Sequence, residues 1–298
     1  MTNEERAPAT VERKTVALRD VNVEIFVGGP MSGPMVCASH PADTFDAGTV
    51  ELVAGTVHAR VACVNPNGIG RRDAPEVASL DQMVDRIEAS RRELACGRWI
   101  FWGMSGGGWL AQIYAHRYPE SLAGIVVESA CPCFRERLAD PACVLSPRFP
   151  AWQAPLRAAG LYSEQAHSEP WPGEDTEWLT VDGVGEVFRR RQGPALLVSP
   201  GPLTSAMKRV MPRLWEFDSR AWIRTIRVPT LVLCGSADPV VPVRHARAVH
   251  EAIAGSLFVE VPGAGHVPLA EKRPEVATTF AGFVSALPPG AWRDGPDR

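Results

Sequence analysis

The sequence lacks a continuous apolar run of the roughly 18 residues that a membrane-spanning helix needs. Residues 1–10 are polar and lack the apolar centre of a signal peptide. Lysine is scarce, occurring only at Lys14, Lys208 and Lys272, and the formal net charge of −3 gives no basic field for nucleic acid or an anionic membrane. We therefore expect a cytoplasmic protein that binds neither nucleic acid nor membrane.

The cysteines do not form a recognisable framework. There are seven of them, an odd number at irregular spacing, and Cys131 and Cys133 have neither a redox nor a usual zinc spacing. Free buried thiols in a reducing compartment fit this pattern better than disulfides. Because the sequence contains no other credible ligand cluster, we expect no metal and no organic cofactor.

What is present is an alternation of short β-rich runs with helical patterns, in a chain of 298 residues that is 45% hydrophobic. This alternation predicts an α/β fold, with a mainly parallel sheet and helices on both faces. The expected strands are Thr15–Leu18, Val21–Val27, Met35–Ser39, Val57–Val64, Trp99–Trp102, Leu122–Glu128, Thr230–Cys234 and Leu257–Val261. The expected helices are Asp46–Ala54, Ser79–Leu94, Gly107–Arg117, Val243–Ala254 and Pro274–Ala286.

The alternation breaks between residues 131 and 227, where the chain is rich in Pro, Trp and Arg. An irregular block between two regular ones indicates an insertion into the order of the sheet. We therefore expect residues 14–130 and 228–287 to form one core and residues 131–227 to form an insertion. Residues 1–13 and 288–298 are expected to be loose tails.

A G-x-S-x-G pattern stands between a predicted strand and a predicted helix. Residues 103–107 read Gly-Met-Ser-Gly-Gly, between Trp99–Trp102 and Gly107–Arg117. Such a tight turn strains the serine, requires small flanking residues and aims backbone N–H groups at a reacting carbonyl. The pattern predicts Ser105 as a nucleophile and Gly106 as an oxyanion donor; the alternative is a plain glycine-rich turn.

Serine needs a base to take its proton, and His266 has the most suitable position among the histidines. It follows the strand Leu257–Val261 through a Pro-Gly-Ala-Gly turn. This position places an imidazole at the same sheet edge as Ser105. The other histidines considered lie in strand or helix patterns or in the insertion.

Asp238 is the expected acid, because it follows the strand Thr230–Cys234. A carboxylate there reaches the far nitrogen of the imidazole and fixes its tautomer. Two alternatives stay open. Asp238 can be an ordinary turn residue before Pro239, and Glu128, which also ends a strand, is a rival acid.

These motifs resemble the α/β-hydrolase superfamily, specifically its capped serine esterase, epoxide-hydrolase and proline-iminopeptidase-like branch. The resemblance is carried by residues 103–107, 235–242 and 262–266, in the chain order Ser, Asp, His. It implies the α/β-hydrolase fold, with a mainly parallel sheet flanked by helices. It also implies that residues 131–227 are a helical cap (lid) over the site.

Two departures from the family pattern lie in residues 39–42 and in the loop after the strand Val57–Val64, where residues 65–71 keep a glycine turn without the charges usual in the family. Where the family usually has His-Gly, residues 39–42 read Ser-His-Pro-Ala, and proline has no N–H to donate. Ala42 is the matching oxyanion donor, with Asp43 as the alternative. The His-Gly-Gly-Pro-Gly stretch of proline iminopeptidases is missing, which disfavours an aminopeptidase. Serine at the elbow disfavours epoxide hydrolases and dehalogenases.

The insertion holds five tryptophans. These are Trp152, Trp171, Trp178, Trp215 and Trp222. The favoured interpretation is that they form the core of the insertion and its contact with the sheet. The alternative is that some line an apolar pocket, and Trp178 and Trp215, with Met104 beside the nucleophile, are then the residues expected to contact the substrate. The substrate expected from this lining is a small molecule with an acyl group, apolar or bulky. The sequence leaves the oligomeric state open.

The sequence thus predicts a serine hydrolase that cleaves a carboxylic ester, thioester or lactone through an acyl-serine intermediate. A second enzymatic hypothesis uses the same triad for acyl transfer, cyclisation, or amide or carbon–carbon hydrolysis. A third hypothesis is a non-catalytic ligand-binding protein on the same fold.

Overall fold

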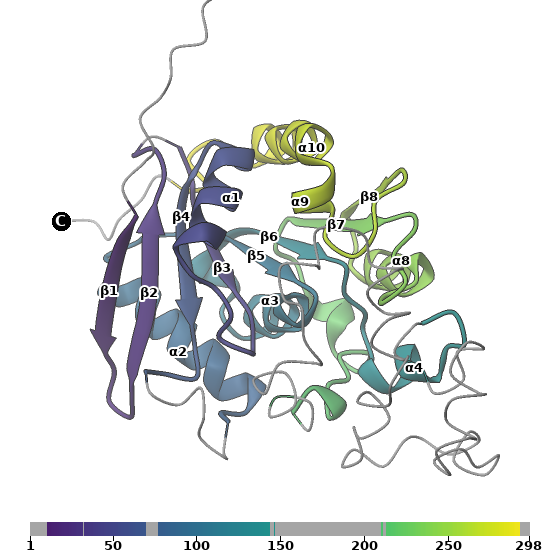
Figure 1. Ribbon diagram of the computed structural model, residues 1–298, viewed down its shortest axis with the longest axis horizontal. Coiled ribbons are helices and arrows are strands. Elements are labelled where there is room, and N and C mark those ends of the chain that lie inside the picture. Colours follow the sequence, from purple (N-terminus) through teal and green to yellow (C-terminus); the bar gives the residue numbers. More distant parts are fainter. Residues whose placement is uncertain are drawn as a thin grey trace, which may run out of the picture.

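One sheet organises the whole chain. The computed structural model describes residues 11–31, 33–69, 77–143, 146, 210 and 213–292. Within these residues, eight strands form one sheet in the order β1-β2-β4-β3-β5-β6-β7-β8 (Figure 1). The strands are β1 (Glu12–Ala17), β2 (Asn22–Gly28), β3 (Met35–Ser39), β4 (Arg60–Asn65), β5 (Trp99–Met104), β6 (Leu122–Glu128), β7 (Thr230–Gly235) and β8 (Leu257–Val261).

The first two strands differ in direction from the rest. β1 pairs with β2, and β2 with β4, in antiparallel fashion, whereas every pairing from β4 through β3, β5, β6 and β7 to β8 is parallel. Parallel neighbours bring the carboxyl ends of their strands to one edge of the sheet, where ligands usually bind in open α/β sheets. That edge therefore collects the loops that follow β3, β5, β6, β7 and β8.

Helices cover both faces of the sheet (Figure 1). The helices α1 (Ala47–Val57), α9 (Pro268–Glu271) and α10 (Arg273–Ala286) lie on one face, while α2 (Leu80–Glu93), α3 (Gly106–Arg117) and α8 (Val243–Ala252) lie on the other. Two separate hydrophobic cores result, one under each helical layer. This three-layer arrangement confirms the predicted fold class.

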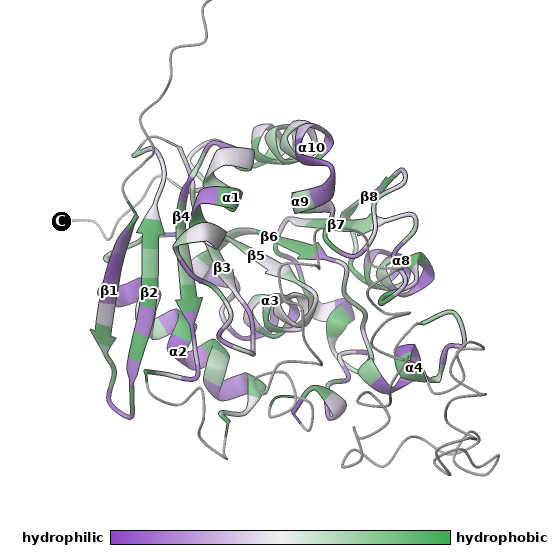
Figure 2. Ribbon diagram, viewed as in Figure 1, coloured by the Kyte–Doolittle hydropathy of each residue, from purple (hydrophilic) through white to green (hydrophobic). Residues whose placement is uncertain are grey.

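The central strands are apolar because both of their faces are covered. All residues of β6 and β7 are buried, and β5 is buried up to Gly103. In contrast, α2 buries apolar residues, together with Arg86 and Glu88, and exposes other charged residues, so that it is banded in Figure 2. The central strands and α2 differ in composition because the strands are covered on both faces, whereas the helix is covered on one.

Local sequence signals set the helix ends. Ser79 and Gln82 form the expected capping box of α2, with each side chain bonded to the other's backbone N–H. The boundary near residue 58 differs from the prediction. α1 continues through Val57 and stops at His58, whose left-handed backbone (φ 51°) turns the chain, so β4 begins only at Arg60. Apolar β-branched residues near this boundary are compatible with a helix or a strand, and the left-handed C-cap residue His58 sets where the helix ends.

The irregular block begins after β6 and ends before β7. Its described parts include α4 (Phe134–Ala139) and a short 3-10 turn (Ile223–Thr225). The two ends of the block are joined where Phe134 N–H donates to Phe217 O at 3.1 Å. Most of the predicted cap, Trp178 included, lies outside the described residues. In the described part of the chain, no helix is long and apolar enough to cross a membrane.

Candidate active site

Ser105 occupies a strained turn between a strand and a helix. β5 ends at Met104, α3 begins at Gly106, and Ser105 between them has φ 51° and ψ −116°. A positive φ is costly for a residue with a side chain, and such strain is concentrated at functional sites. Two hydrogen bonds hold the turn. The N–H of Ser105 donates to Glu128 O at 2.8 Å, and Gly108 N–H donates to Ser105 O at 2.9 Å.

The glycines around Ser105 are required by close backbone contacts. A Cβ on Gly103 would lie 2.1 Å from the carbonyl oxygen of Gly107. A Cβ on Gly107 would lie 2.3 Å from the carbonyl oxygen of Ser39, at the end of β3. Both distances are far below any tolerated contact, so only glycine permits this turn. The half-buried side chain of Ser105 therefore stands at the carboxyl edge of the sheet.

His266 and Asp238 are paired at the same edge. Nδ1 of His266 lies 2.9 Å from Oδ2 and 3.1 Å from Oδ1 of Asp238, and both residues are buried. The backbone N–H groups of Val240 and Val241 donate to Oδ1 of Asp238 at 2.8 and 2.9 Å. The carboxylate that accepts these bonds also accepts a hydrogen bond from Nδ1–H of His266. With the proton on Nδ1, Nε2 is unprotonated and can accept a proton.

Hydrogen bonds to the loop after β7 and to α9 hold the loop that carries His266. Ala237 N–H donates to Ala264 O at 2.9 Å, joining the loops after β7 and β8. Glu271 on α9 accepts hydrogen bonds from the N–H groups on both sides of His266, from Gly265 at 2.6 Å and from Val267 at 3.0 Å. Sequence reasoning missed Glu271, and a carboxylate five residues after a predicted base is the signal that could have found it.

Glu128, the rival acid, has other partners. Its Oε2 accepts from Nε1 of Trp102 at 2.6 Å, and its Oε1 accepts from Leu269 N–H at 2.9 Å. Burial raises the pKa of Glu128 to about 7, against the lowering effect of these two hydrogen bonds. Among the described residues, Asp238 and not Glu128 is hydrogen bonded to His266.

The loop after β3 lies against the start of α3. The Nε2 atom of His40 lies 3.0 Å from the place where a Cβ on Gly106 would stand. Burial, and then the charge of His266, lower the pKa of His40 to about 4. The N–H of Ala42, which we predicted as an oxyanion donor, donates to Nδ1 of His40 at 3.1 Å. Ala42 can serve as predicted only if this bond opens.

The residues predicted to contact substrate are placed less completely. Met104 is the last residue of β5 and is half-buried beside Ser105. Trp215 packs on α4, with its ring 6.0 Å from that of Phe134 and under the guanidinium of Arg135. Trp178 lies outside the described residues. No group of three or more metal-ligating side chains occurs in the described part of the chain.

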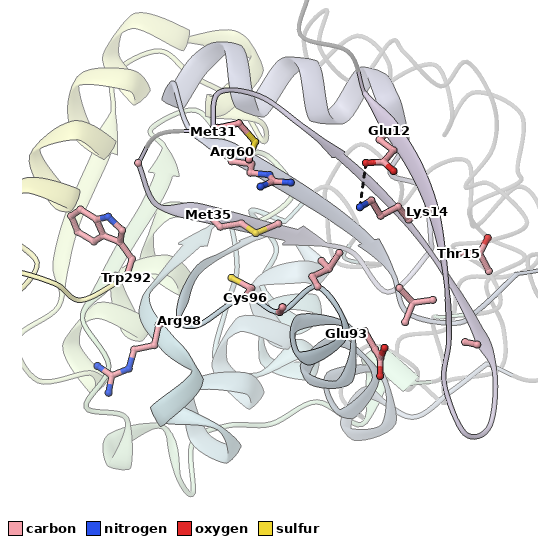
Figure 3. A pocket seen from close by; sticks show the side chains of 15 residues that line it. Glu12, Lys14, Thr15, Met31, Met35, Arg60, Glu93, Cys96, Arg98 and Trp292 are labelled. Carbon is pink, nitrogen blue, oxygen red and sulfur yellow. Dashed lines mark ion pairs between the residues drawn. The ribbon is translucent and has the colours of Figure 1, made fainter. Parts of the chain in front are cut away.

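A separate hollow of about 730 Å³ lies at the other end of the strands (Figure 3). Met35 and Arg60 in its lining are the first residues of β3 and β4, and Arg98 directly precedes β5. The hollow therefore opens at the amino ends of the parallel strands, away from Ser105 and His266. It lies outside the site described above.

Comparisons with known proteins identify the family of the chain. A model of the alpha/beta hydrolase family matches residues 25–279. The chain is 26% identical over 214 residues to a pimeloyl-acyl-carrier-protein methyl ester esterase of Edwardsiella ictaluri (strain 93-146), covering 70% of this chain and 76% of that protein. It is 24% identical over 237 residues to a proline iminopeptidase of Thermoplasma volcanium, covering 73% and 76%.

Solved structures share the fold. An alpha/beta fold family hydrolase from Bacillus anthracis str. Sterne superimposes with a TM-score of 0.69 at 18% identity, covering 92% of this chain and 99% of that one.

Proposed function

The chain belongs to the alpha/beta hydrolase family, and from that premise we propose that it is a serine hydrolase that cleaves a carboxylic ester, thioester or lactone. Ser105 is the nucleophile, His266 the base and Asp238 the acid that orients the base. The observation that carries this proposal is the 2.9 Å pair between His266 Nδ1 and Asp238 Oδ2, at the sheet edge where Ser105 stands in a strained turn.

The reaction begins with proton transfer from Ser105 to His266. As Oγ attacks the acyl carbon, Nε2 takes the hydroxyl proton, and the electron pair of the carbonyl π bond moves onto its oxygen. Asp238 accepts a hydrogen bond from Nδ1 and stabilises the imidazolium that forms. The N–H of Gly106, the first residue of α3, donates to the developing oxyanion at a helix N-terminus.

The tetrahedral intermediate then loses the alcohol or thiol. Its electron pair returns to form the carbonyl, the bond to the leaving oxygen or sulfur breaks, and the proton on His266 goes to the leaving group. Water then attacks the acyl carbon while His266 takes one of its protons. The bond between the acyl carbon and Oγ breaks, His266 returns the proton to Oγ, and the carboxylic acid is released with Ser105 regenerated.

The substrate class is an acyl compound whose acyl chain is apolar or bulky. The relative from Edwardsiella ictaluri is named as a methyl ester esterase, which supports an ester over an amide. The iminopeptidase name of another relative makes amide hydrolysis the alternative to exclude. In this proposal residues 131–227 form a cap that selects among acyl chains, with Met104, Trp178 and Trp215 contacting the substrate.

A panel of p-nitrophenyl esters of graded chain length, set beside prolyl p-nitroanilide, tests the proposal. We expect turnover of at least one ester and a loss on the order of 10⁶ in kcat for Ser105→Ala. The matched control is Ser129→Ala, because Ser129 also follows a parallel strand with a positive φ of 50° but is fully buried. Cleavage of the anilide alone, or turnover by Ser105→Ala above a tenth of wild type, would contradict the proposal.

A further inference from the structure

The side chain of His40 is buried against the first turn of α3. His40 follows β3 and is 7% exposed. Its Nε2 lies 3.0 Å from the position that a Cβ on Gly106 would occupy, and Cδ of Pro41 lies 3.2 Å from the same point. This Cβ position and the backbone N of Gly106 are both bonded to the Cα of Gly106. Nε2 of His40 therefore lies close to the residue that follows the nucleophile and supplies the N–H at the start of α3.

One hydrogen bond fixes the tautomer of His40. The N–H of Ala42 donates to Nδ1 at 3.1 Å, in buried surroundings. A ring nitrogen that accepts a hydrogen bond carries no proton, so the proton of the neutral imidazole is on Nε2. Burial and the nearby His266 lower the pKa of His40 to about 4, which keeps the ring neutral near pH 7. Among the described residues, no group accepts a hydrogen bond from Nε2.

The backbone of residues 41–43, which follow His40, offers no free donor. Pro41 has no N–H, the N–H of Ala42 is bonded to the imidazole, and the N–H of Asp43 donates to His40 O at 3.1 Å. An oxyanion hole needs preorganised donors aimed at the developing charge, and usually more than one. The loop thus presents one available hydrogen-bond donor beside Gly106, the Nε2–H group of His40.

We propose that Nε2–H of His40 is the second donor of the oxyanion hole, acting together with the N–H of Gly106. The inference rests on the proposed function. When Oγ of Ser105 attacks the acyl carbon, the carbonyl oxygen gains the π electron pair, and both donors hydrogen-bond to it without giving up their protons. When the intermediate collapses, the pair returns to the carbonyl and the two bonds weaken. An imidazole side chain here takes the place of a backbone N–H that Pro41 cannot supply.

Two substitutions separate the proposed role of Nε2–H as a donor from the role of Nδ1, which accepts the hydrogen bond from Ala42 N–H. In His40→Asn, Oδ1 stands where Nδ1 stood and still accepts from Ala42, but nothing replaces Nε2–H. In His40→Gln, the longer amide brings an N–H group to the place of Nε2. We expect His40→Asn to lower kcat for the best p-nitrophenyl ester by about 10²–10³ with KM little changed. His40→Gln should recover kcat to within about tenfold of wild type.

A trifluoromethyl ketone bearing the same acyl chain gives a second readout. It forms a tetrahedral adduct with the serine, so its affinity should fall with kcat/KM in His40→Asn and recover in His40→Gln. A purely structural role for His40 would lower the melting temperature without this parallel loss of affinity. That result would overturn the inference.

Wild-type kcat and ketone affinity in His40→Asn would also overturn it, and would return the role to the N–H of Ala42. Failure of the proposed function is seen separately, as activity that persists in Ser105→Ala whatever the His40 variants do.

Discussion

Nδ1 of His266 lies 2.9 Å from Oδ2 of Asp238, although 28 positions separate the two residues in the chain. The parallel order of β7 and β8 makes this pairing possible, because it brings the loops after the two strands side by side. The backbones of these two loops approach each other so closely that a Cβ on Gly235 would lie 2.1 Å from the carbonyl oxygen of Gly265. The geometry of the base thus depends on the backbone of both loops.

The first prediction concerns the acid. Asp238→Asn keeps an oxygen for the N–H groups of Val240 and Val241 but presents an amide to His266, which favours the wrong imidazole tautomer. We expect kcat to fall by about 10⁴ with a melting temperature close to that of wild type. Glu128→Gln is the comparison. Near-normal turnover in Asp238→Asn together with an inactive Glu128→Gln would make Glu128 the acid.

The second prediction concerns stability and pH. The pKa of Glu128 is raised from an ordinary 4.5 to about 7, so the folded state keeps a proton that the unfolded chain has released. Between these values the folded state binds more protons, and this group makes stability fall as pH rises, by roughly 3 kcal/mol in all. The stability that this group contributes is therefore fully present below pH 4.5 and is lost as the pH rises from 4.5 to about 7.

Unfolding in denaturant at pH 5 and pH 8 measures this effect. Glu128→Gln stays neutral, so its free energy of unfolding should change less between the two pH values than that of wild type. Glu275→Gln, at an exposed position on α10, serves as the control and should behave as wild type. An unchanged pH dependence in Glu128→Gln would show that Glu128 ionises normally.

The third prediction concerns the turn around Ser105. Gly103→Ala places a Cβ 2.1 Å from Gly107 O, so the turn must distort. We expect loss of activity and of more than about 2 kcal/mol of stability. Gly282→Ala is the matched control, because its Cβ meets nothing within 4 Å, and alanine should stabilise α10 by about 0.5–1 kcal/mol. An active and stable Gly103→Ala would mean that the turn is not under steric constraint.

The sequence was sufficient to predict the sheet, and local signals in it point to the three residues of the proposed triad, which stay a prediction. Ser105 directly follows an apolar run, Asp238 and His266 each lie in the turn after such a run, and turn residues mark where each run stops. Those signals are local, so they can be read without a structure. The helix end at His58 was predicted wrongly for the same reason, since apolar β-branched residues around Val57 suit a helix or a strand.

Other parts of the site depend on contacts between distant segments. The approach of His40 to Gly106 joins the loops after β3 and β5, and the short helix α9 that carries Glu271 has no periodic pattern to reveal it. Neither the tautomer of His40 nor the bond that occupies the N–H of Ala42 can be read from residue types. The predicted donor Ala42 illustrates this limit, since matching a motif position does not establish that its N–H is free.

The fourth prediction concerns the cap. Trp178→Leu and Trp215→Leu should change the preferred chain length of p-nitrophenyl esters by removing apolar contact with the acyl chain. Trp215→Leu should also lower the melting temperature, because the indole packs on Phe134 and Arg135. Lower stability without any change in chain-length preference, in both variants, would leave these tryptophans a packing role only.

The most direct test of the account is covalent labelling with a fluorophosphonate, followed by intact mass and peptide mapping. The account predicts one added phosphonyl group on Ser105, retained in Ser129→Ala and absent in Ser105→Ala and His266→Ala. Labelling of another residue would contradict the claim that Ser105 is the nucleophile. So would the absence of labelling in wild-type protein whose melting temperature shows that it is folded.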